Sequence, residues 1–121
     1  MIERVCWFAL MLLHVPPALA LARPEQFIAM YGVDPASGTF ALMQHRAALF
    51  LVVVVICGWA TLRPEVRSLA SVTVGISMIS FLTIWWAAGM PAQFKTIAVA
   101  DLVGVPVLLL AAWLAFSAHA R

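Results

Sequence analysis

Several ionisable side chains lie inside long apolar runs of this 121-residue chain. Arg46 lies about two helical turns inside the run 40–62, and Asp101 lies inside the last apolar run. A charged side chain at the centre of a bilayer costs ~2.5–3.5 kcal/mol on insertion scales, unless it finds a partner or water. Because Asp101 has the opposite charge, we expect it to pair with Arg46 in the interior of a helical bundle.

Two histidines extend this polar group, because His14 interrupts the first apolar run and His45 precedes Arg46. In an enzyme, one of these imidazoles would be the acid-base group, with Asp101 as its orienting carboxylate. We find no nucleophile motif to support that chemistry, and the spacing of the histidines and cysteines does not suit a metal. We therefore expect a non-catalytic protein without a metal site, and the sequence indicates no particular cofactor.

The composition indicates a protein that lives in lipid. Hydrophobic residues make up 65% of the chain and charged residues 10%, whereas a soluble domain has about 25% charged residues. The formal net charge of +2 is small and scattered, so we expect no nucleic-acid partner. The apolar segments each reach or approach the ~20 residues that cross a ~30 Å hydrocarbon layer. They lie at about 5–22, 40–62, 69–89 and 92–118.

These segments predict an all-α fold, an integral membrane four-helix bundle in a single domain of residues 1–121. The first segment imitates a secretory signal, with Arg4 before an apolar run and the small residues ALALA at 18–22. His14 interrupts that run, however, and removal of the segment would leave Asp101 less well enclosed. We therefore read the segment as the first helix of the bundle.

Residues 23–39 form the only sizeable loop between the predicted helices. Pro24 suits the first turn of a helix and Gly32 suits its end, so we predict a short interfacial helix at 24–31. Thr39 would cap the next helix. The segment is either a lid over the bundle or an ordinary linker, and the sequence leaves both interpretations open.

Small residues predict where the helices approach one another closely. Ser71 and Gly75 have a four-residue spacing, which favours the helix at 69–89 as the central packing partner. Ala100 and Gly104 form a similar pair in the last helix. Cationic residues near the helix ends predict the orientation, because they favour the cytoplasmic side. With the amino terminus inside, that side has Arg4, Arg63, Arg67 and Arg121, against Arg23 and Lys95 outside, so we expect both termini in the cytoplasm.

Helical geometry places the polar residues at comparable depths. Arg46 lies about 10 Å along its helix and Asp101 about 15 Å along its own, both counted from the non-cytoplasmic side. His14 lies somewhat deeper, and Tyr31 can close the group from the outer surface. The side chain of His45 points about 100° away from that of Arg46 around the helix, so the two side chains cannot both point directly at the same site.

Two interpretations of this cluster remain open. In the structural one, Arg46 and Asp101 neutralise each other and fix the packing of their helices, while His14 bonds a carbonyl freed by Pro16 and Pro17. In the functional one, the cluster lines a pocket that holds the polar end of a largely apolar ligand.

Five short motifs together resemble a known group of proteins. They are LLHVPP, MYGVD, LMQHRAALF, FLTIWW and VADLV, which span nearly the whole chain. In these motifs the chain resembles a family of small, uncharacterised bacterial four-helix inner-membrane proteins, and its architecture is more loosely similar to that of DoxX-like proteins. The resemblance implies that His14, Tyr31, His45, Arg46 and Asp101 belong to the family pattern, and it implies no established activity.

Our leading hypothesis is a multi-pass protein of the bacterial inner membrane that binds an apolar or lipid-like ligand, or a membrane partner. Binding would use the outer half of the bundle. One alternative is an accessory subunit of a larger respiratory or photosynthetic complex. Another is a lipid-directed enzyme that uses His14 or His45. The expected partners are membrane lipid, a larger membrane complex or a second copy of the chain.

Overall fold

The computed structural model describes residues 1–121, apart from the side chain of Met30. Within this described part the chain forms helices joined by short links and contains no strand, which confirms the predicted all-α fold. The helices are α1 (Ile2–Leu19), α2 (Glu25–Tyr31), α3 (Gly38–Leu62), α4 (Arg67–Ala87) and α5 (Lys95–His119). Short 3-10 turns precede the last two, η1 (Pro64–Val66) and η2 (Ala92–Phe94).

The long helices of the described chain have the length and composition of membrane spans. Helix α1 has 18 residues and α3 has 25, and the mean hydropathies of their 18-residue apolar stretches are 1.3 and 2.0. The segments Pro64–Ala87 and Ala92–His119 are also long and apolar enough, with values of 1.7 and 2.3. A helix satisfies its own backbone hydrogen bonds, so it can cross hydrocarbon. The chain is therefore a small multi-pass membrane protein.

Helix α1 lies between α3 and α5 in the bundle. It packs along α3 on one side and against α5 on the other, while α4 packs mainly against α5. Among the described helices, α3 makes few contacts with α4 and does not pack closely on α5. The expectation that the helix at 69–89, now α4, is the central partner is therefore wrong.

The closest approach of helices involves Gly104 of α5 rather than Gly75 of α4. A Cβ atom on Gly104 would lie 2.7 Å from Met78 Cε and 2.8 Å from Leu13 Cδ2, well inside normal contact. A Cβ on Gly75 would meet only Leu108 Cδ2, at an ordinary 3.8 Å. The absence of a side chain at Gly104 therefore lets α5 come close to both α1 and α4.

Local capping explains how the link between α1 and α3 is shaped. Gly32 ends α2 with a φ of 63°, a left-handed conformation that glycine adopts without strain. Helix α3 begins earlier than predicted, and its cap is Ser37 instead of Thr39, because the Ser37 hydroxyl oxygen accepts from Phe40 N at 3.3 Å. The same hydroxyl donates to the Asp34 carbonyl oxygen at 2.7 Å, which fixes the turn before the helix.

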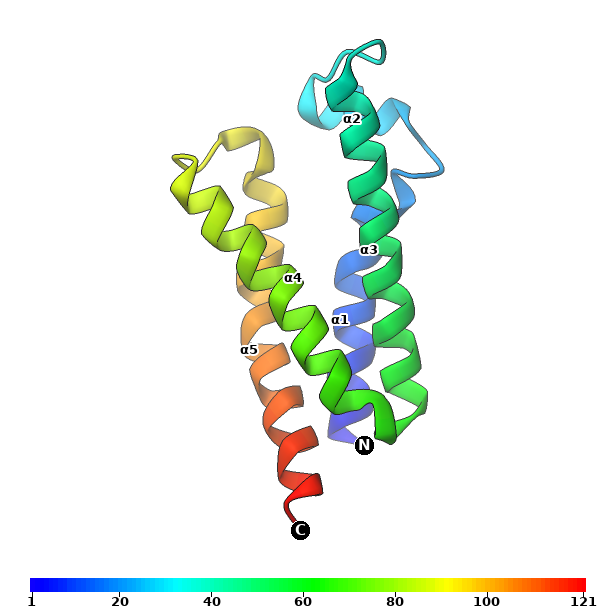
Figure 1. Ribbon diagram of the computed structural model, residues 1–121, viewed down its shortest axis with the longest axis vertical. Helices are drawn as coiled ribbons and strands as arrows, with labels where there is room; N and C mark the ends of the chain where they lie inside the picture. Colours follow the sequence, from blue (N-terminus) through cyan, green and yellow to red (C-terminus); the bar gives the residue numbers. More distant parts are fainter.

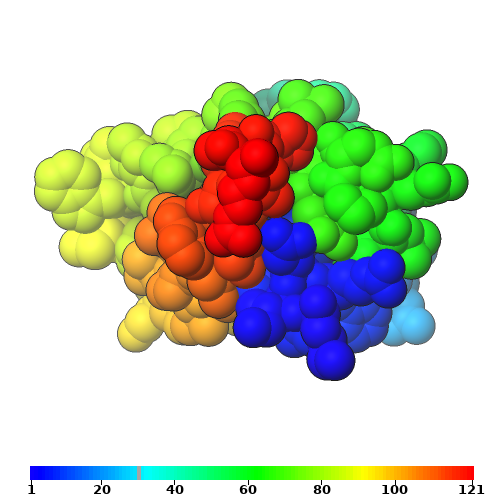
Figure 2. Space-filling view, turned by 90° about the horizontal axis from the view of Figure 1, so that it is seen from below, coloured from blue at the N-terminus to red at the C-terminus, as the bar shows by residue number. Residues whose placement is uncertain are grey.

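Both chain termini lie at one end of the bundle, beside the tight turn between α3 and α4 (Figures 1 and 2). Figure 2 shows this end, where the first and last residues lie next to the segment around residues 60–70. The link that contains α2 and the link that contains η2 lie at the other end. Ring contacts join these two links, because Tyr31 and Phe94 have centroids 5.4 Å apart.

Candidate functional site

A cavity of about 510 Å³ lies in the half of the bundle away from the termini. Helix α1 contributes five of its twelve lining residues and α5 contributes four, and α2 and α3 complete the wall. The lining is largely apolar, and a few polar side chains converge on it, which is typical of sites for small apolar molecules. The polar lining residues are His14, Gln26, Tyr31, Thr96 and Asp101.

His14 is the most enclosed polar residue of this cavity, with 1% of its surface exposed. Its Nδ1 lies 2.8 Å from the carbonyl oxygen of Leu10, one turn earlier in α1. A carbonyl oxygen only accepts hydrogen bonds, so Nδ1 carries the proton and donates. In the neutral imidazole, Nε2 is then an acceptor, and this buried atom has no hydrogen-bond partner within the described structure.

The carbonyl that His14 binds differs from the one that the sequence indicated. Pro16 and Pro17 lack an N–H group, so the carbonyls that lose their helical donors are those of Leu12 and Leu13. Leu10 is instead the residue whose carbonyl stands one helical turn before His14 itself. His14 therefore does not donate to a carbonyl that the prolines leave without a donor. Its ring position directs Nε2 toward Asp101 of α5.

Asp101 of α5 faces His14 across a short gap. Its Oδ1 lies 4.0 Å from His14 Nε2, too far for a direct hydrogen bond, and 3% of the residue is exposed. An ionised carboxylate and the free Nε2 are both acceptors. Two acceptors facing each other at this distance lack a donor between them, and the cavity runs along both groups.

Tyr31 closes the cavity at the α2 side, as the sequence placed it. Its ring stacks on Phe27 of the same helix with centroids 6.4 Å apart. Burial raises the pKa of the Tyr31 phenol, and the nearby positive charge of Arg46 lowers it by a smaller amount. The phenol therefore stays protonated over the physiological range, and can donate one hydrogen bond toward the cavity.

Arg46 lies beside this cavity, and it does not form the expected ion pair with Asp101. Its guanidinium carbon is 4.5 Å from the ring centroid of Phe81, 5.3 Å from that of Phe50 and 5.7 Å from that of Phe94. In the described residues, the group within 4.0 Å of Asp101 is His14. The expected pair fails because α1 separates α3 from α5, so the two helices that carry these charges do not meet.

His45 lies apart from the other candidates. It is exposed, whereas Arg46 is half-buried and turned toward the bundle. Successive helix positions differ by about 100°, so the exposure of His45 follows from the inward position of its neighbour. The structure thus brings together His14, Tyr31 and Asp101, with Arg46 adjacent.

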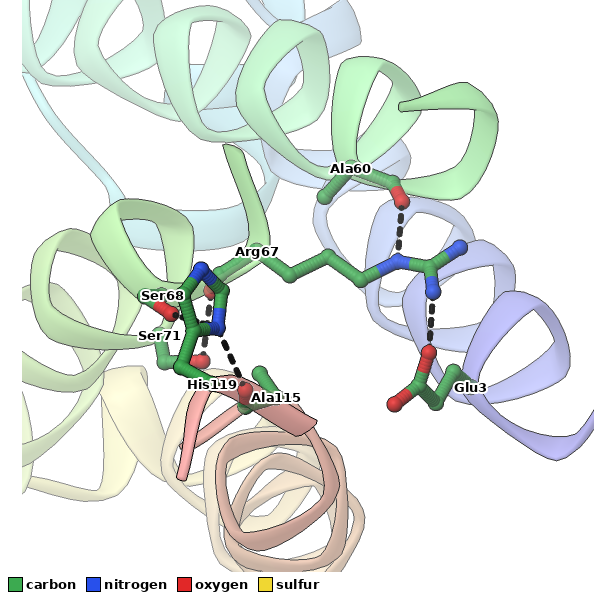
Figure 3. A network of polar contacts seen from close by, with 7 residues as sticks. All are labelled: Glu3, Ala60, Arg67, Ser68, Ser71, Ala115 and His119. Carbon is green, nitrogen blue, oxygen red and sulfur yellow. Dashed lines mark hydrogen bonds and ion pairs between the residues drawn. The ribbon is translucent and has the colours of Figure 1, made fainter. Parts of the chain in front are cut away.

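A second polar group, which the sequence did not reveal, lies at the terminal end of the bundle (Figure 3). Arg67 is 5% exposed, and its Nε donates to the Ala60 carbonyl oxygen at 2.9 Å while its guanidinium pairs with Glu3. In the sequence, Arg67 stands out only as a cationic residue near the end of a helix. Glu3 near the start of α1 was the available signal, because an acidic residue at that end can compensate a buried arginine.

The described His, Cys, Asp and Glu side chains do not form a group of three that could hold a metal ion. The buried Cys6 and Cys57 are free thiols that pack in the apolar core. The polar side chains of the cavity therefore suit hydrogen bonding to an organic ligand better than metal coordination.

Comparison with protein-family models, with curated proteins and with solved structures finds no significant match to this chain. The resemblance to bacterial four-helix inner-membrane proteins thus stays a prediction. What the protein does has to be inferred from the geometry of its cavity and of the charged side chains around it.

Proposed function

We propose that this membrane protein binds an apolar molecule with a hydrogen-bond donor at one end, in the cavity between α1, α2, α3 and α5. The observation that carries this proposal is the gap between His14 Nε2 and Asp101 Oδ1. Both atoms accept, both residues are buried, and both line the cavity. A ligand hydroxyl would donate to one of these acceptors, and a ligand amine with two N–H groups would donate to both, which offsets the cost of burying them.

The size and lining of the cavity support a lipid-like ligand. A volume of about 510 Å³ is within the range of ~300–1,000 Å³ for small-molecule sites. Leu13, Ile97 and Ala100 would surround an aliphatic chain or ring, and the polar group would lie at His14 and Asp101. Ligand binding of this kind needs no chemical step, so we infer a binding protein rather than a lipid-directed enzyme.

We further propose that the protein resides in the bacterial inner membrane with both termini in the cytoplasm. The resemblance supports the location, and the excess of arginine at the terminal end supports the orientation. The cavity would then open within the outer half of the membrane. Single cysteines at Ser37 and at Arg121 would test this, because only Ser37→Cys should react with an impermeant thiol reagent added outside cells. Labelling of Arg121→Cys alone would reverse the orientation.

The ligand proposal is tested with two probes that differ in one property. 1-Decanol and methyl nonyl ether have the same number of heavy atoms, but only the alcohol donates a hydrogen bond. We expect the alcohol to raise the melting temperature of the detergent-solubilised protein more than the ether, because ligands that bind the folded state stabilise it. His14→Leu removes one of the two acceptors and leaves Asp101, so it should reduce the difference between the two probes.

A matched pair of variants on α5 provides the control. Ala100 lines the cavity, so Ala100→Phe should fill it and abolish the response to 1-decanol. Val103 is 63% exposed on the same helix, so Val103→Phe should leave the response intact. If the wild type responds equally to alcohol and ether, no donor is needed in the gap. That result would favour a doubly protonated His14 paired with Asp101, and would overturn the proposal.

A further inference from the structure

Arg46 has a positive charge that no acidic side chain of the described chain compensates at short range. Within 4.0 Å, Glu65 pairs with Arg63 and Glu3 pairs with Arg67, while the group nearest to Asp101 is the neutral imidazole of His14. Three phenyl rings surround the guanidinium, and its Nη2 is buried without a hydrogen-bond partner. Ring faces attract the charge, but they do not replace a hydrogen-bond acceptor in the plane of the guanidinium.

A shallow groove between α3 and α4 runs beside this guanidinium. Arg46, Leu49 and Phe50 of α3 and Ser77 and Phe81 of α4 line a small cavity of about 110 Å³ there. The groove exists because α3 and α4 pack loosely on each other. It is separate from the larger cavity, with Phe50 lining both.

The depth of Arg46 matches the level of lipid headgroups. Helix α3 has 25 residues, which is about 37 Å of helix, whereas the hydrocarbon layer is ~30 Å thick. Counting back about 20 residues from Leu62 places the hydrocarbon boundary near Met43. The Cα of Arg46 then lies only about 5 Å inside it. At this level the guanidinium lies against the rings of Phe50, Phe81 and Phe94, within reach of the headgroup region.

We propose that Arg46 holds the phosphate of an anionic phospholipid whose acyl chains lie along the groove between α3 and α4. Guanidinium and phosphate form strong, often bidentate, charge-assisted hydrogen bonds. Ser77 adds a hydroxyl to the lining, and the exposed Leu49 offers an apolar surface for the chains. The net negative charge of the lipid compensates a cation that forms no direct ion pair within the described chain. This site is independent of the larger cavity and of its ligand.

The test measures lipid retention by native mass spectrometry. Protein is purified with an equimolar mixture of phosphatidylglycerol and phosphatidylcholine of the same acyl chains. We expect the wild type to retain phosphatidylglycerol preferentially, and Arg46→Gln to reduce that preference about tenfold, because the variant loses the charge-assisted hydrogen bonds to the lipid phosphate. Arg63→Gln is the matched control, since Arg63 is exposed at the opposite end of α3.

Two further variants keep the proposal testable if Arg46→Gln does not fold. Arg46→Lys keeps the positive charge but loses the planar guanidinium that can form two parallel hydrogen bonds to a phosphate. Retention of phosphatidylglycerol should therefore fall to an intermediate value. Ser77→Leu narrows the groove without a change of charge, and should also lower retention. Ala100→Phe should leave it unchanged, which separates this site from the larger cavity.

Three results would overturn the proposal. Equal retention of the two lipids by the wild type would mean that Arg46 only extends its charge toward water at the interface. A preference for phosphatidylglycerol that survives both Arg46→Gln and Ser77→Leu would place the lipid elsewhere. Displacement of the bound lipid by inorganic phosphate would show a site for free anions and would refute the lipid assignment.

Discussion

Arg67 provides a sharp test of how charges stabilise the terminal end of this bundle. Its side chain is buried between α1, α3 and α4, where it bonds the Ala60 carbonyl oxygen and pairs with Glu3 (Figure 3). Arg67→Met keeps much of the length of the side chain and removes both interactions. The Ala60 carbonyl then loses a donor near the end of α3, and Glu3 loses its counter-ion.

The expected cost follows from the burial of the two partners. Removing one member of a fully buried ion pair costs ~3–5 kcal/mol. The Glu3 side chain is 25% exposed, so water takes over part of its solvation, and we expect a loss of about 2–3 kcal/mol. Arg63 is the matched control four positions earlier: its pair with Glu65 spans 3.8 Å, and the two side chains are 66% and 65% exposed. Arg63→Met should cost about 0–1 kcal/mol.

The free energy of unfolding can be followed by tryptophan fluorescence as detergent-solubilised protein is titrated with a denaturing detergent. Glu3→Gln and the double variant with Arg67→Met complete a thermodynamic cycle, in which the double change should cost clearly less than the sum. Equal losses for Arg67→Met and Arg63→Met would show that the burial of Arg67 has no energetic consequence. Additive single losses would show that Glu3 and Arg67 do not interact, which would refute the arrangement in Figure 3.

Two further predictions concern packing and protonation. Gly104→Ala has to displace the ends of the Met78 and Leu13 side chains, so it should lower the melting temperature slightly, at a net cost of about 0–1 kcal/mol. Gly75→Ala has room for the added methyl group and should be neutral or stabilising, so similar effects of both would contradict the close approach. Tyr31 is the only tyrosine of the chain, and because burial raises its pKa, tyrosinate absorbance should appear at higher pH in the folded protein than in the denatured one. Because the folded state then binds the phenol proton more tightly, the free energy of unfolding should fall as pH rises from about 10 through the raised pKa of Tyr31. A titration midpoint in the folded protein at or below that of free tyrosine would contradict the burial of the phenol.

The approximate positions and lengths of the membrane-spanning helices could be predicted, because the thickness of the membrane sets how long each apolar segment must be. The expected segments at 5–22, 40–62, 69–89 and 92–118 each overlap one long helix, and the short helix expected at 24–31 corresponds to α2. Apolar length and backbone satisfaction are properties of one segment at a time, so a single sequence contains them. Boundaries shifted by a few residues where a local hydrogen bond decides the start, as Ser37 does for α3.

The neighbours of each helix could not be predicted in the same way. In a soluble bundle, the apolar face of a helix indicates the core, but lipid-facing and core-facing residues are equally apolar here. Leu109 is 62% exposed, and Leu108 beside it is 4% exposed. The small-residue pairs at Ser71–Gly75 and Ala100–Gly104 looked equivalent in the sequence. The side chains on the facing helices decide which pair marks a close approach of helices, and at Gly104 these side chains are Met78 and Leu13.

The separation of Arg46 from Asp101 has the same origin, and it leaves the two charges without a direct ion pair. Opposite charges at similar depth predicted a pair, but α1 lies between their helices and brings His14 to Asp101 instead. Phe50 contacts both sides of this arrangement, since its ring centroid lies 6.0 Å from that of His14 and 5.3 Å from the Arg46 guanidinium carbon. A direct pair would have satisfied both charges within the protein. Held apart by α1 and Phe50, Asp101 instead faces His14 Nε2 across the cavity, and the Arg46 guanidinium lies against the rings of Phe50, Phe81 and Phe94.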